Sequence, residues 1–136
     1  MKSDPFARKT QADLIIERAA QQLGILLKEA ALELRPFPPF PGAFFTYGVE
    51  VNLEGVERPD LGCIVVGEDG ELYELELQID FGDDFSDAVD IVQARDETLK
   101  KLEDLHPRDY IILASNALSQ LTELLLERAD AGGASV

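Results

Sequence analysis

The sequence predicts an α+β fold in two layers: an N-terminal helix, a three-stranded antiparallel meander and two C-terminal helices, in the order α-β-β-β-α-α. Apolar residues recur at helical spacing near both ends of the chain. Between these ends, residues 71–81 alternate apolar and polar side chains, as a half-buried strand does. The pair Asp69-Gly70 before that segment is typical of a hairpin turn. Together these observations predict helices packed on one side of a small sheet.

The first predicted helix spans about Gln11 to Arg35. Thr10 is placed to cap it, with Asp13 as the capping-box partner three residues on. Pro36 ends it, because the residue before a proline is disfavoured in the α conformation. An apolar stripe of this width has to be buried against a sheet or a partner. The stripe consists of Ala12, Ile15, Ile16, Ala19, Leu23, Leu26, Leu27, Ala30 and Leu34.

A proline-rich segment, residues 36–42, follows this helix and contains four of the seven prolines. Such a segment is extended and stiff, close to polyproline II. It could serve as the ligand of a proline-recognising domain. The alternative is a linker whose Phe37 and Phe40 pack on the core, and we favour this because basic specificity residues are scarce nearby.

Three strands are predicted next, over Ala43–Leu53, Leu61–Val66 and Glu71–Phe81. The last two form a hairpin around Asp69-Gly70. We expect the helices to cover one face of the third strand and carboxylates to occupy the other. The first face holds Tyr73, Leu75, Leu77, Ile79 and Phe81, and the second holds Leu72, Glu74, Glu76, Gln78 and Asp80.

Two helices are predicted after the sheet. The first runs from about Ser86 to Leu105, with Leu99 in its apolar stripe and i,i+4 ion pairs such as Asp96–Lys100 on its wet side. The second is ambiguous, because residues 108–113 have strand propensity while the apolar positions from Tyr110 to Leu125 keep one helical phase. We predict one helix from about Arg108 to Ala129, with Pro107 in its first turn.

Length and composition predict a single domain, residues 1–136, with disordered tails at 1–9 and 131–136. The chain is 46% apolar, which suffices for a buried core. Its N-terminus lacks the apolar stretch of a signal peptide, and no run approaches the ~20 apolar residues of a membrane span. We therefore expect a cytoplasmic protein.

Charge is concentrated in the middle of the chain. The net charge is −15, and residues 37–92 hold 14 acids against one base, Arg58. This points to one acidic face. It argues against nucleic acid as a partner, because phosphate attraction needs a Lys/Arg surface. It also disfavours binding to anionic membranes.

Nucleophilic catalysis finds little support in the sequence. Cys63 is the only cysteine and lies in an apolar run, which is typical of a small buried hydrophobe. The only histidine, His106, adjoins Pro107 in an apparent turn. The sequence shows no Ser-His-Asp set that this one histidine could support, and it has no glycine-rich phosphate loop.

A cluster of acids lies in the predicted strand-to-helix turn, at Asp80, Asp83, Asp84, Asp87 and Asp90. Close carboxylates repel one another, which favours binding a hard cation such as Mg²⁺ or Ca²⁺. The spacing does not match an EF-hand loop. The alternative is a turn whose acids cap the following helix and are solvated.

A second set of candidate residues consists of Pro59-Asp60 and the segment Glu74-Leu75-Glu76-Leu77-Gln78. This pattern resembles the metal site of restriction-endonuclease-like nucleases. The resemblance implies that Asp60 and Glu76 hold Mg²⁺ and that Gln78 stands where the family usually has a lysine. Glu74 and Asp80 are further candidate ligands. The family fold also needs a strand at residues 108–113. The alternative is an amphipathic strand with a solvated acidic face.

Two functions follow from these observations. The first is a non-catalytic protein-interaction module (an adaptor, chaperone-like or regulatory protein), with a protein partner and a possible homodimer. In length, low isoelectric point and terminal helices the chain is similar to the acidic chaperones of type III secretion, although their later pair of strands is absent. The second is a divalent-metal enzyme, or its inactive relative, that uses Asp60, Glu76 and Gln78.

Overall fold

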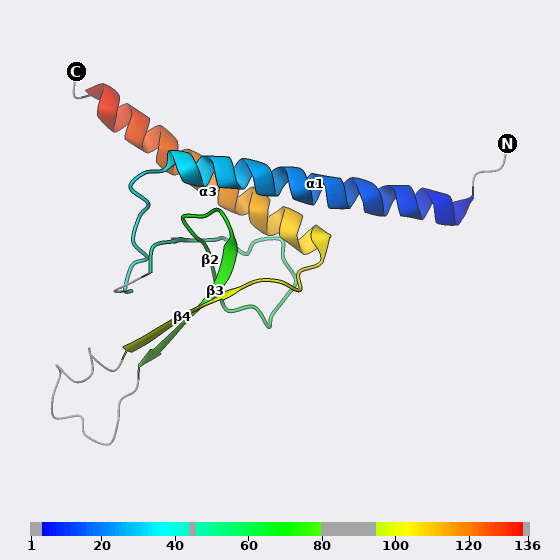
Figure 1. The fold of residues 1–136 in the computed structure, drawn as a ribbon, viewed down its shortest axis with the longest axis horizontal. Helices are drawn as coiled ribbons and strands as arrows, with labels where there is room; N and C mark the ends of the chain where they lie inside the picture. The colour runs from blue at the N-terminus through cyan, green and yellow to red at the C-terminus, as the bar shows by residue number, and fades with distance from the viewer. Residues whose placement is uncertain (1–3, 44–45, 80–94, 135–136) are drawn as a thin grey trace.

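The structure is a computed structural model that describes residues 4–43, 46–79 and 95–134. Within these residues, an N-terminal helix, a four-stranded antiparallel sheet and a C-terminal helix make a small α+β fold (Figure 1). The predicted order α-β-β-β-α-α is therefore wrong, because a fourth strand stands where a helix was expected. The elements are α1 (Pro5–Glu33), β1 (Val49–Glu50), β2 (Cys63–Val66), β3 (Leu72–Ile79), β4 (Arg95–Lys101) and α3 (Pro107–Ala134).

Helix α1 begins earlier than predicted because Asp4 caps it. The Asp4 Oδ1 atom accepts a hydrogen bond from the Phe6 amide at 3.0 Å, and Pro5 suits the first helical turn. The predicted cap, Thr10, lies inside the helix, where its hydroxyl donates to the Phe6 carbonyl at 2.9 Å. Most of segment 1–9, expected as a disordered tail, is thus helical from Pro5 onward. Helix α3 likewise reaches Ala134, inside the other expected tail.

The sheet has the strand order β1-β2-β3-β4, with every neighbouring pair antiparallel. The predicted hairpin between β2 and β3 is confirmed, and Gly70 in its turn has a φ of +79°. Its turn is closed by a hydrogen bond from the Gly67 amide to the Glu71 carbonyl at 2.9 Å. The predicted strand Ala43–Leu53 is mostly irregular, and only Val49–Glu50 pairs with β2.

Strand β4 replaces the C-terminal part of the helix predicted for Ser86–Leu105. It pairs with β3 from Tyr73 opposite Lys101 to Ile79 opposite Arg95. The i,i+4 charge spacing that favoured a helix is overridden by this cross-strand pairing, which sets Lys100 opposite Glu74. Residues 102–105, the end of that predicted helix, are irregular, and residues 86–94 lie outside the described residues.

The helices cover the opposite face of the sheet from the one predicted. Ile64, Val66 and Leu72 pack with both helices in the main core cluster. Tyr73 and Leu75 lie on the other face, together with Val65. The prediction failed because alternation on β3 shows which residues share a face, but not which face meets the helices. The fully buried side chains at the centre are Leu27, Leu34, Ile64, Leu113, Leu121, Val65 and Val66.

The proline-rich segment covers part of the far face of the sheet. Phe37 joins the helix-side core, and Phe40 packs with Val65 and Leu75 on the other side. Both phenylalanines are buried, so the predicted linker with core-packed aromatics is confirmed. This segment supplies the cover that the third strand's apolar face needs in the absence of a helix there.

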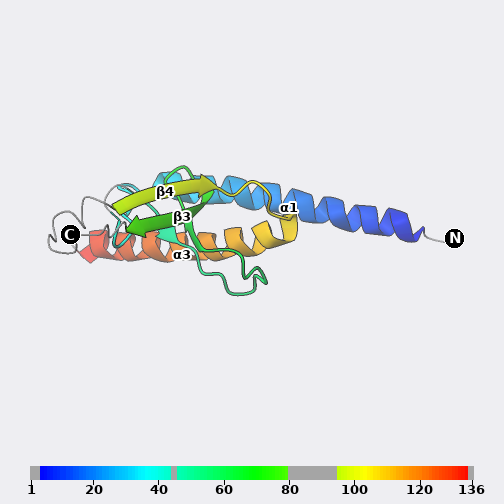
Figure 2. The same cartoon turned by 90° about the horizontal axis from the view of Figure 1, so that it is seen from below.

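Residues 108–113 are helical and belong to α3. The predicted continuous helix is therefore confirmed, and the alternative of a strand at these residues is wrong. Helix α3 runs beside α1 in the same direction (Figures 1 and 2). The helices approach closely at Gly24, where an added Cβ would lie 2.9 Å from the Tyr110 Oη atom.

Two side-chain amides of α3 hold the segment that follows β1. Gln120 Nε2 donates to the Glu50 carbonyl at 2.7 Å, and Gln120 Oε1 accepts from the Asn52 amide at 2.9 Å. Asn116 Nδ2 donates to the carbonyls of Asn52, at 2.8 Å, and Glu54, at 3.1 Å. The polar groups of this irregular segment are therefore satisfied by one helix face.

The N-terminal part of α1 extends past the other described elements (Figures 1 and 2). A helix of 29 residues is about 43 Å long, whereas the eight residues of β3 span about 27 Å. The sheet is therefore too short to cover α1 along its whole length. Helix α3, with 28 residues, is nearly as long as α1 but is displaced toward the C-terminal end of α1, which leaves the N-terminal part uncovered (Figures 1 and 2).

Candidate functional site

Asp60, the first predicted metal ligand, lies in the turn before β2 and is engaged by Arg58. The Arg58 guanidinium donates to both carboxylate oxygens, at 2.8 Å from Nε to Oδ1 and 2.6 Å from Nη2 to Oδ2. This hydrogen bonding lowers the pKa of Asp60 and raises the pKa of Arg58. Arg58 Nη1 also lies 3.9 Å from Asp109 Oδ2 on α3. Arg58 thus balances the charge of Asp60 and joins this turn to the helix.

Asp60 and Glu74 line one hollow of about 210 Å³ beside the end of β4. Glu74 Oε2 accepts a hydrogen bond from the Gly62 amide at 3.3 Å. Lys100 and Lys101 also line the hollow, so its walls carry both signs of charge. This mixture is suited to ion pairing within the protein, and differs from the uniformly acidic lining that a divalent cation prefers.

Glu76 and Gln78 lie farther along β3, opposite Thr98 and Asp96 of β4. Glu76 is exposed and is not among the residues that line the hollow. In residues 4–43, 46–79 and 95–134, no group of three or more histidine, cysteine or acidic side chains is arranged to hold a metal ion. The candidates Asp80, Asp83, Asp84, Asp87 and Asp90 lie outside the described residues, so the metal site there stays a prediction.

The nuclease resemblance also requires a strand at residues 108–113. Helix α3 occupies this range without interruption. The structure therefore brings Asp60 and Glu74 together and leaves Glu76 and Gln78 farther along the same strand, β3. Residues 108–113 are helical, so the strand that would complete that family's core is not formed there.

A different surface stands out on α1. Every residue from Asp4 to Ile15 is exposed, although this stretch is helical. We call this stretch the arm of α1. Phe6 is 81% exposed and Ile15 is 66% exposed. The exposed apolar side chains continue past the arm, on the side of α1 away from its buried residues Leu27, Ala30 and Ala31. We call this surface the outward face of α1; its apolar members are Leu14, Ile15, Ile25, Leu26 and Leu32. Leu14 also lines a cavity toward the start of α3.

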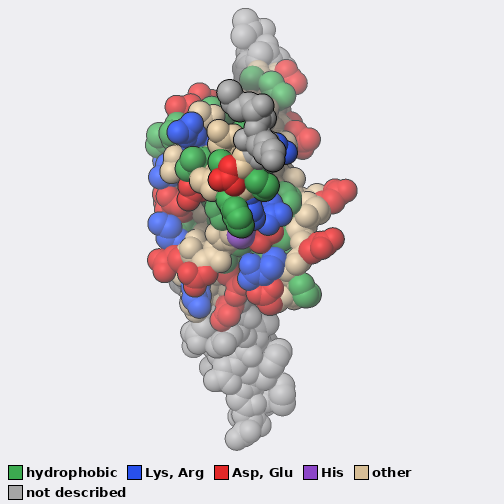
Figure 3. All heavy atoms as spheres, turned by 90° about the vertical axis from the view of Figure 1, so that its right-hand side faces the viewer, with side chains coloured by type: hydrophobic (Ala, Val, Ile, Leu, Met, Phe, Trp, Pro, Cys, Tyr) green, Lys and Arg blue, Asp and Glu red, His purple; other side chains and the backbone are tan. Residues whose placement is uncertain are grey.

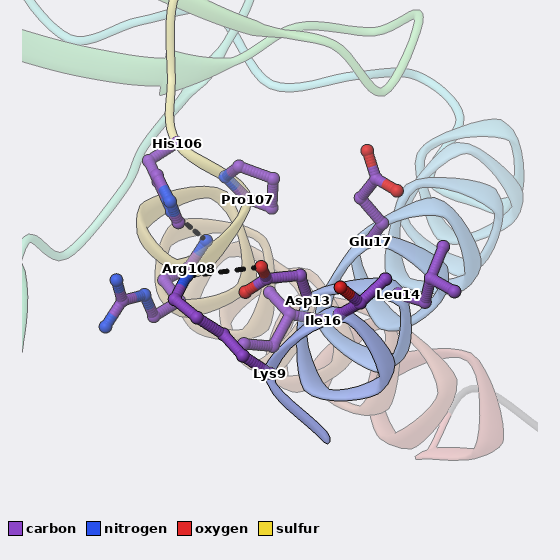
Figure 4. Close-up of a pocket in the computed structure, with 9 residues that line it drawn as sticks. Lys9, Asp13, Leu14, Ile16, Glu17, His106, Pro107 and Arg108 are labelled. Atoms are coloured by element: carbon purple, nitrogen blue, oxygen red, sulfur yellow. Dashed lines mark hydrogen bonds and ion pairs between the residues drawn. The ribbon is translucent and has the colours of Figure 1, made fainter. Parts of the chain in front are cut away.

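The arm and the start of α3 enclose an open cavity of about 370 Å³ (Figure 4). Lys9 forms an ion pair with Asp13 at 3.4 Å at its edge. The His106 Nδ1 atom accepts a hydrogen bond from the Arg108 amide at 3.1 Å, which turns the chain into α3. These polar contacts are local to each helix. Every residue of the arm is exposed, so the start of α3 covers little of it.

A third hollow, of about 300 Å³, lies on the sheet face that turns away from the helices. Tyr73 donates a hydrogen bond from its hydroxyl to Asp69 Oδ2 at 2.5 Å. This bond, with burial, raises the pKa of Tyr73 to about 12. Tyr47 and Leu99 complete a small exposed apolar patch around it. The hydrogen bond to Asp69 therefore stabilises the neutral phenol of Tyr73.

Cys63 agrees with its interpretation as a small hydrophobe. It is half-buried and packs beside Phe40, Val65 and Leu75. Burial raises the pKa of its thiol, with a further contribution from Glu50. A raised pKa reduces the reactive thiolate at neutral pH.

Sequence reasoning missed the outward face of α1. It assigned Ala12, Ile15 and Leu26 to the buried stripe, but all three are exposed. Leu27, also assigned to the stripe, is buried, and so is Ala31, which was not assigned to it. A signal was present in the sequence, because the apolar pairs at 14–15 and 25–26 widen the stripe beyond what one packing face can bury. The length of the helix relative to the strands was a second signal.

Comparison with protein-family models, with curated proteins and with solved structures finds no match. Neither described helix combines the length and apolar character needed to cross a membrane.

Proposed function

We propose that this chain is a non-catalytic protein-interaction module, of the adaptor, chaperone-like or regulatory kind, that binds a protein through the outward face of α1. The observation that carries the proposal is the arm, a helical stretch from Asp4 to Ile15 in which every residue is exposed.

The arm gains little stability from tertiary packing, because every one of its residues is exposed. It continues a helix of 29 residues and so needs no nucleation of its own, but most helical stability in proteins comes from packing. The arm also holds Phe6 and Ile15 in water. A partner that covers them removes apolar area from water at roughly 25 cal/mol per Å² and supplies the packing that the arm lacks.

Charge limits where such a partner can bind. Helix α1, Pro5–Glu33, holds four bases and four acids, whereas the chain as a whole carries −15. The view from the N-terminal side of the molecule shows acidic, basic and hydrophobic side chains intermixed (Figure 3). The outward face of α1 is therefore the surface on which apolar contacts can form without a field of one sign.

The metal-enzyme alternative has no comparable support among the described residues. Asp60 is engaged by Arg58 through both carboxylate oxygens, and α3 replaces the strand that the nuclease resemblance requires. We therefore base the proposed function on α1.

Site-specific photo-crosslinking in the cells that make the protein tests this proposal. Benzoylphenylalanine is placed at Ile15, on the outward face of α1, and in a matched control at Leu126 of α3, which is 61% exposed. We expect position 15 to give adducts of one defined mass, with the captured protein identified by mass spectrometry. Position 126 should give little. Equal or absent adduct formation at the two positions would overturn the proposal.

A further inference from the structure

We propose that the partner of the outward face of α1 is a second copy of this chain, bound antiparallel so that the two α1 helices cross near residue 20. This inference rests on the proposed function and names its partner. It is carried by three features of α1: the spacing of its exposed apolar residues, its zero net charge, and the position of the acidic body at one end of it.

Four of the five apolar residues of the outward face, all but Leu32, are spaced symmetrically about residue 20. One pair, Leu14 and Ile15, lies five to six residues before residue 20, and the other, Ile25 and Leu26, lies five to six residues after it. In an antiparallel pair related by a two-fold axis at residue 20, Leu14 of one copy lies opposite Leu26 of the other, and Ile15 lies opposite Ile25. A two-fold interface requires this self-complementarity.

The polar residues between the two pairs also match in this register. Arg18 and Gln22 lie on the same side of the helix as the apolar pairs at 3.6 residues per turn, and both are exposed. The two-fold axis sets Arg18 of one copy opposite Gln22 of the other. It sets Gln11 opposite Glu29. A guanidinium meets an amide oxygen, and an amide nitrogen meets a carboxylate, so hydrogen bonds replace the solvent of each group.

Net charge favours α1 as the surface on which two copies meet. Two chains of −15 repel one another wherever their acidic surfaces approach. Helix α1 has four bases and four acids, so all of the net charge resides elsewhere in the chain. Contact through α1 brings two neutral surfaces together.

The antiparallel arrangement also separates the two acidic bodies. The buried residues of α1, Leu27, Ala30 and Ala31, show that the body packs near its C-terminal end. A body centred near residue 28 lies about 24 Å along the axis from its two-fold mate, at 1.5 Å per residue. This exceeds the Debye length of about 8 Å at physiological salt, so the repulsion is screened there and grows at low salt. A parallel pair would set the two bodies level with each other.

The contact area predicts a reversible dimer. A strip about 43 Å long and 10–12 Å wide on each helix amounts to on the order of 1,000 Å² for both copies. This is the lower end for specific interfaces, so we expect a dissociation constant of roughly micromolar order.

Molar mass against concentration tests the dimer with the full chain. Light scattering after size-exclusion chromatography should rise from 15.0 kDa toward twice that mass with concentration. Ile15→Asp should raise the dissociation constant at least tenfold, and so should Ile25→Asp, while Leu126→Asp on α3 should not. Thermal melts establish that all three variants fold. Lowering the salt should weaken the dimer, because repulsion between the two acidic bodies then grows. A dimer held together by opposite charges would instead be strengthened by lower salt.

Spin labels test the antiparallel register. On a Cys63→Ser background, a label introduced by Gln11→Cys should lie about 28 Å from its mate, from 27 Å along the axis and a helix spacing of roughly 9 Å. A label introduced by Gln22→Cys should lie about 11 Å from its mate and broaden the continuous-wave spectrum. Short distances at both positions indicate a parallel pair and overturn the proposal.

The outcomes separate this inference from the proposed function. A chain that stays at 15.0 kDa up to about 300 µM is not a dimer, and the inference then fails. If photo-crosslinking at position 15 still captures a different protein, the proposed function stands and the partner named here is wrong. If position 15 gives no adduct above position 126, both fail.

Discussion

Gly70→Ala tests how the β2–β3 hairpin is seated on α1. Gly70 has a φ of +79°, and a Cβ added there would lie 2.6 Å from the Lys28 Cα atom and 3.0 Å from its backbone nitrogen. Two ion pairs hold the same turn: Lys28 of α1 pairs with Glu71 at 3.0 Å, and Arg35, just after α1, pairs with Glu68 at 3.2 Å. The substitution therefore strains the turn and pushes it off the helix.

Two costs contribute to the loss of unfolding free energy expected for Gly70→Ala. A left-handed conformation costs a residue with a Cβ roughly 1–2 kcal/mol. The overlap with Lys28 involves backbone atoms that cannot rotate away, and inserting a methyl into such a contact costs roughly 1–3 kcal/mol more. The unfolding free energy should fall by about 3 kcal/mol in total, which lowers the melting temperature by about 10 °C for a chain of this size.

Gly42→Ala is the matched control. Its φ is +88°, but a Cβ there meets no atom of the described residues within 4 Å. Urea unfolding followed by circular dichroism should give a loss of about 1 kcal/mol for this variant, from the conformational part alone. Equal losses at Gly70 and Gly42 would refute the reasoning, because they would show that the hairpin turn does not press on α1.

Three further substitutions test the core, the pKa of Tyr73, and the clamp, by which we mean the two hydrogen bonds from Gln120 of α3 to Glu50 and Asn52. Leu27→Ala should cost about 3 kcal/mol in urea unfolding, because Leu27 is fully buried, whereas its half-exposed neighbour Leu26 should tolerate alanine at low protein concentration; similar losses would contradict the packing of α1. The folded-state pKa of Tyr73, about 12, lies above the ordinary value of 10, so its stabilisation is present below pH 10 and is lost as the pH rises toward 12. Asp69→Ala should shift one tyrosine transition at 295 nm to lower pH, and an unchanged titration would remove Asp69 as its cause. Gln120→Ala leaves an amide and a carbonyl without a partner and should cost roughly 1–3 kcal/mol in thermal unfolding, while a neutral result would show that water replaces the clamp.

The sequence predicted the elements that carry strong local signals. The β2–β3 hairpin follows from Asp69-Gly70 between two apolar runs, and α3 follows from one helical phase that continues from Tyr110 onward. Phe37 and Phe40 pack on the core as expected. In each case the local preference and the tertiary environment agree.

The remaining errors have a common physical origin, since each depends on what packs against the element. Strand β4 has helical charge spacing, yet it gains a full ladder beside β3. Alternation on β3 could not show which face the helices cover. On α1, periodicity identified an apolar helix but could not show where the body ends, so Ile15 and Leu26 were assigned to the core.

The candidate site, too, was predicted only in part. Asp60 precedes one strand of the predicted hairpin, and the glutamates lie on the other, which suggested that their side chains converge. Asp60 does share a hollow with Glu74. The pattern could not reveal that Arg58, only two residues away, binds both oxygens of Asp60. Asp80, Asp83, Asp84 and Asp87 remain a prediction for Mg²⁺ or Ca²⁺ binding.

The clamp made by Gln120 has a consequence for how this protein behaves when it is crowded. Its side-chain amide donates and accepts at Glu50 and Asn52 as the peptide group of an added strand would, so a strand from another molecule must displace it before joining there. Among the described strands the opposite edge is β4, where Arg95, Lys100 and Lys101 bring like charges together in any in-register stack. Growth into fibres by strand addition is hindered at both edges, which directs association toward finite contacts between side chains.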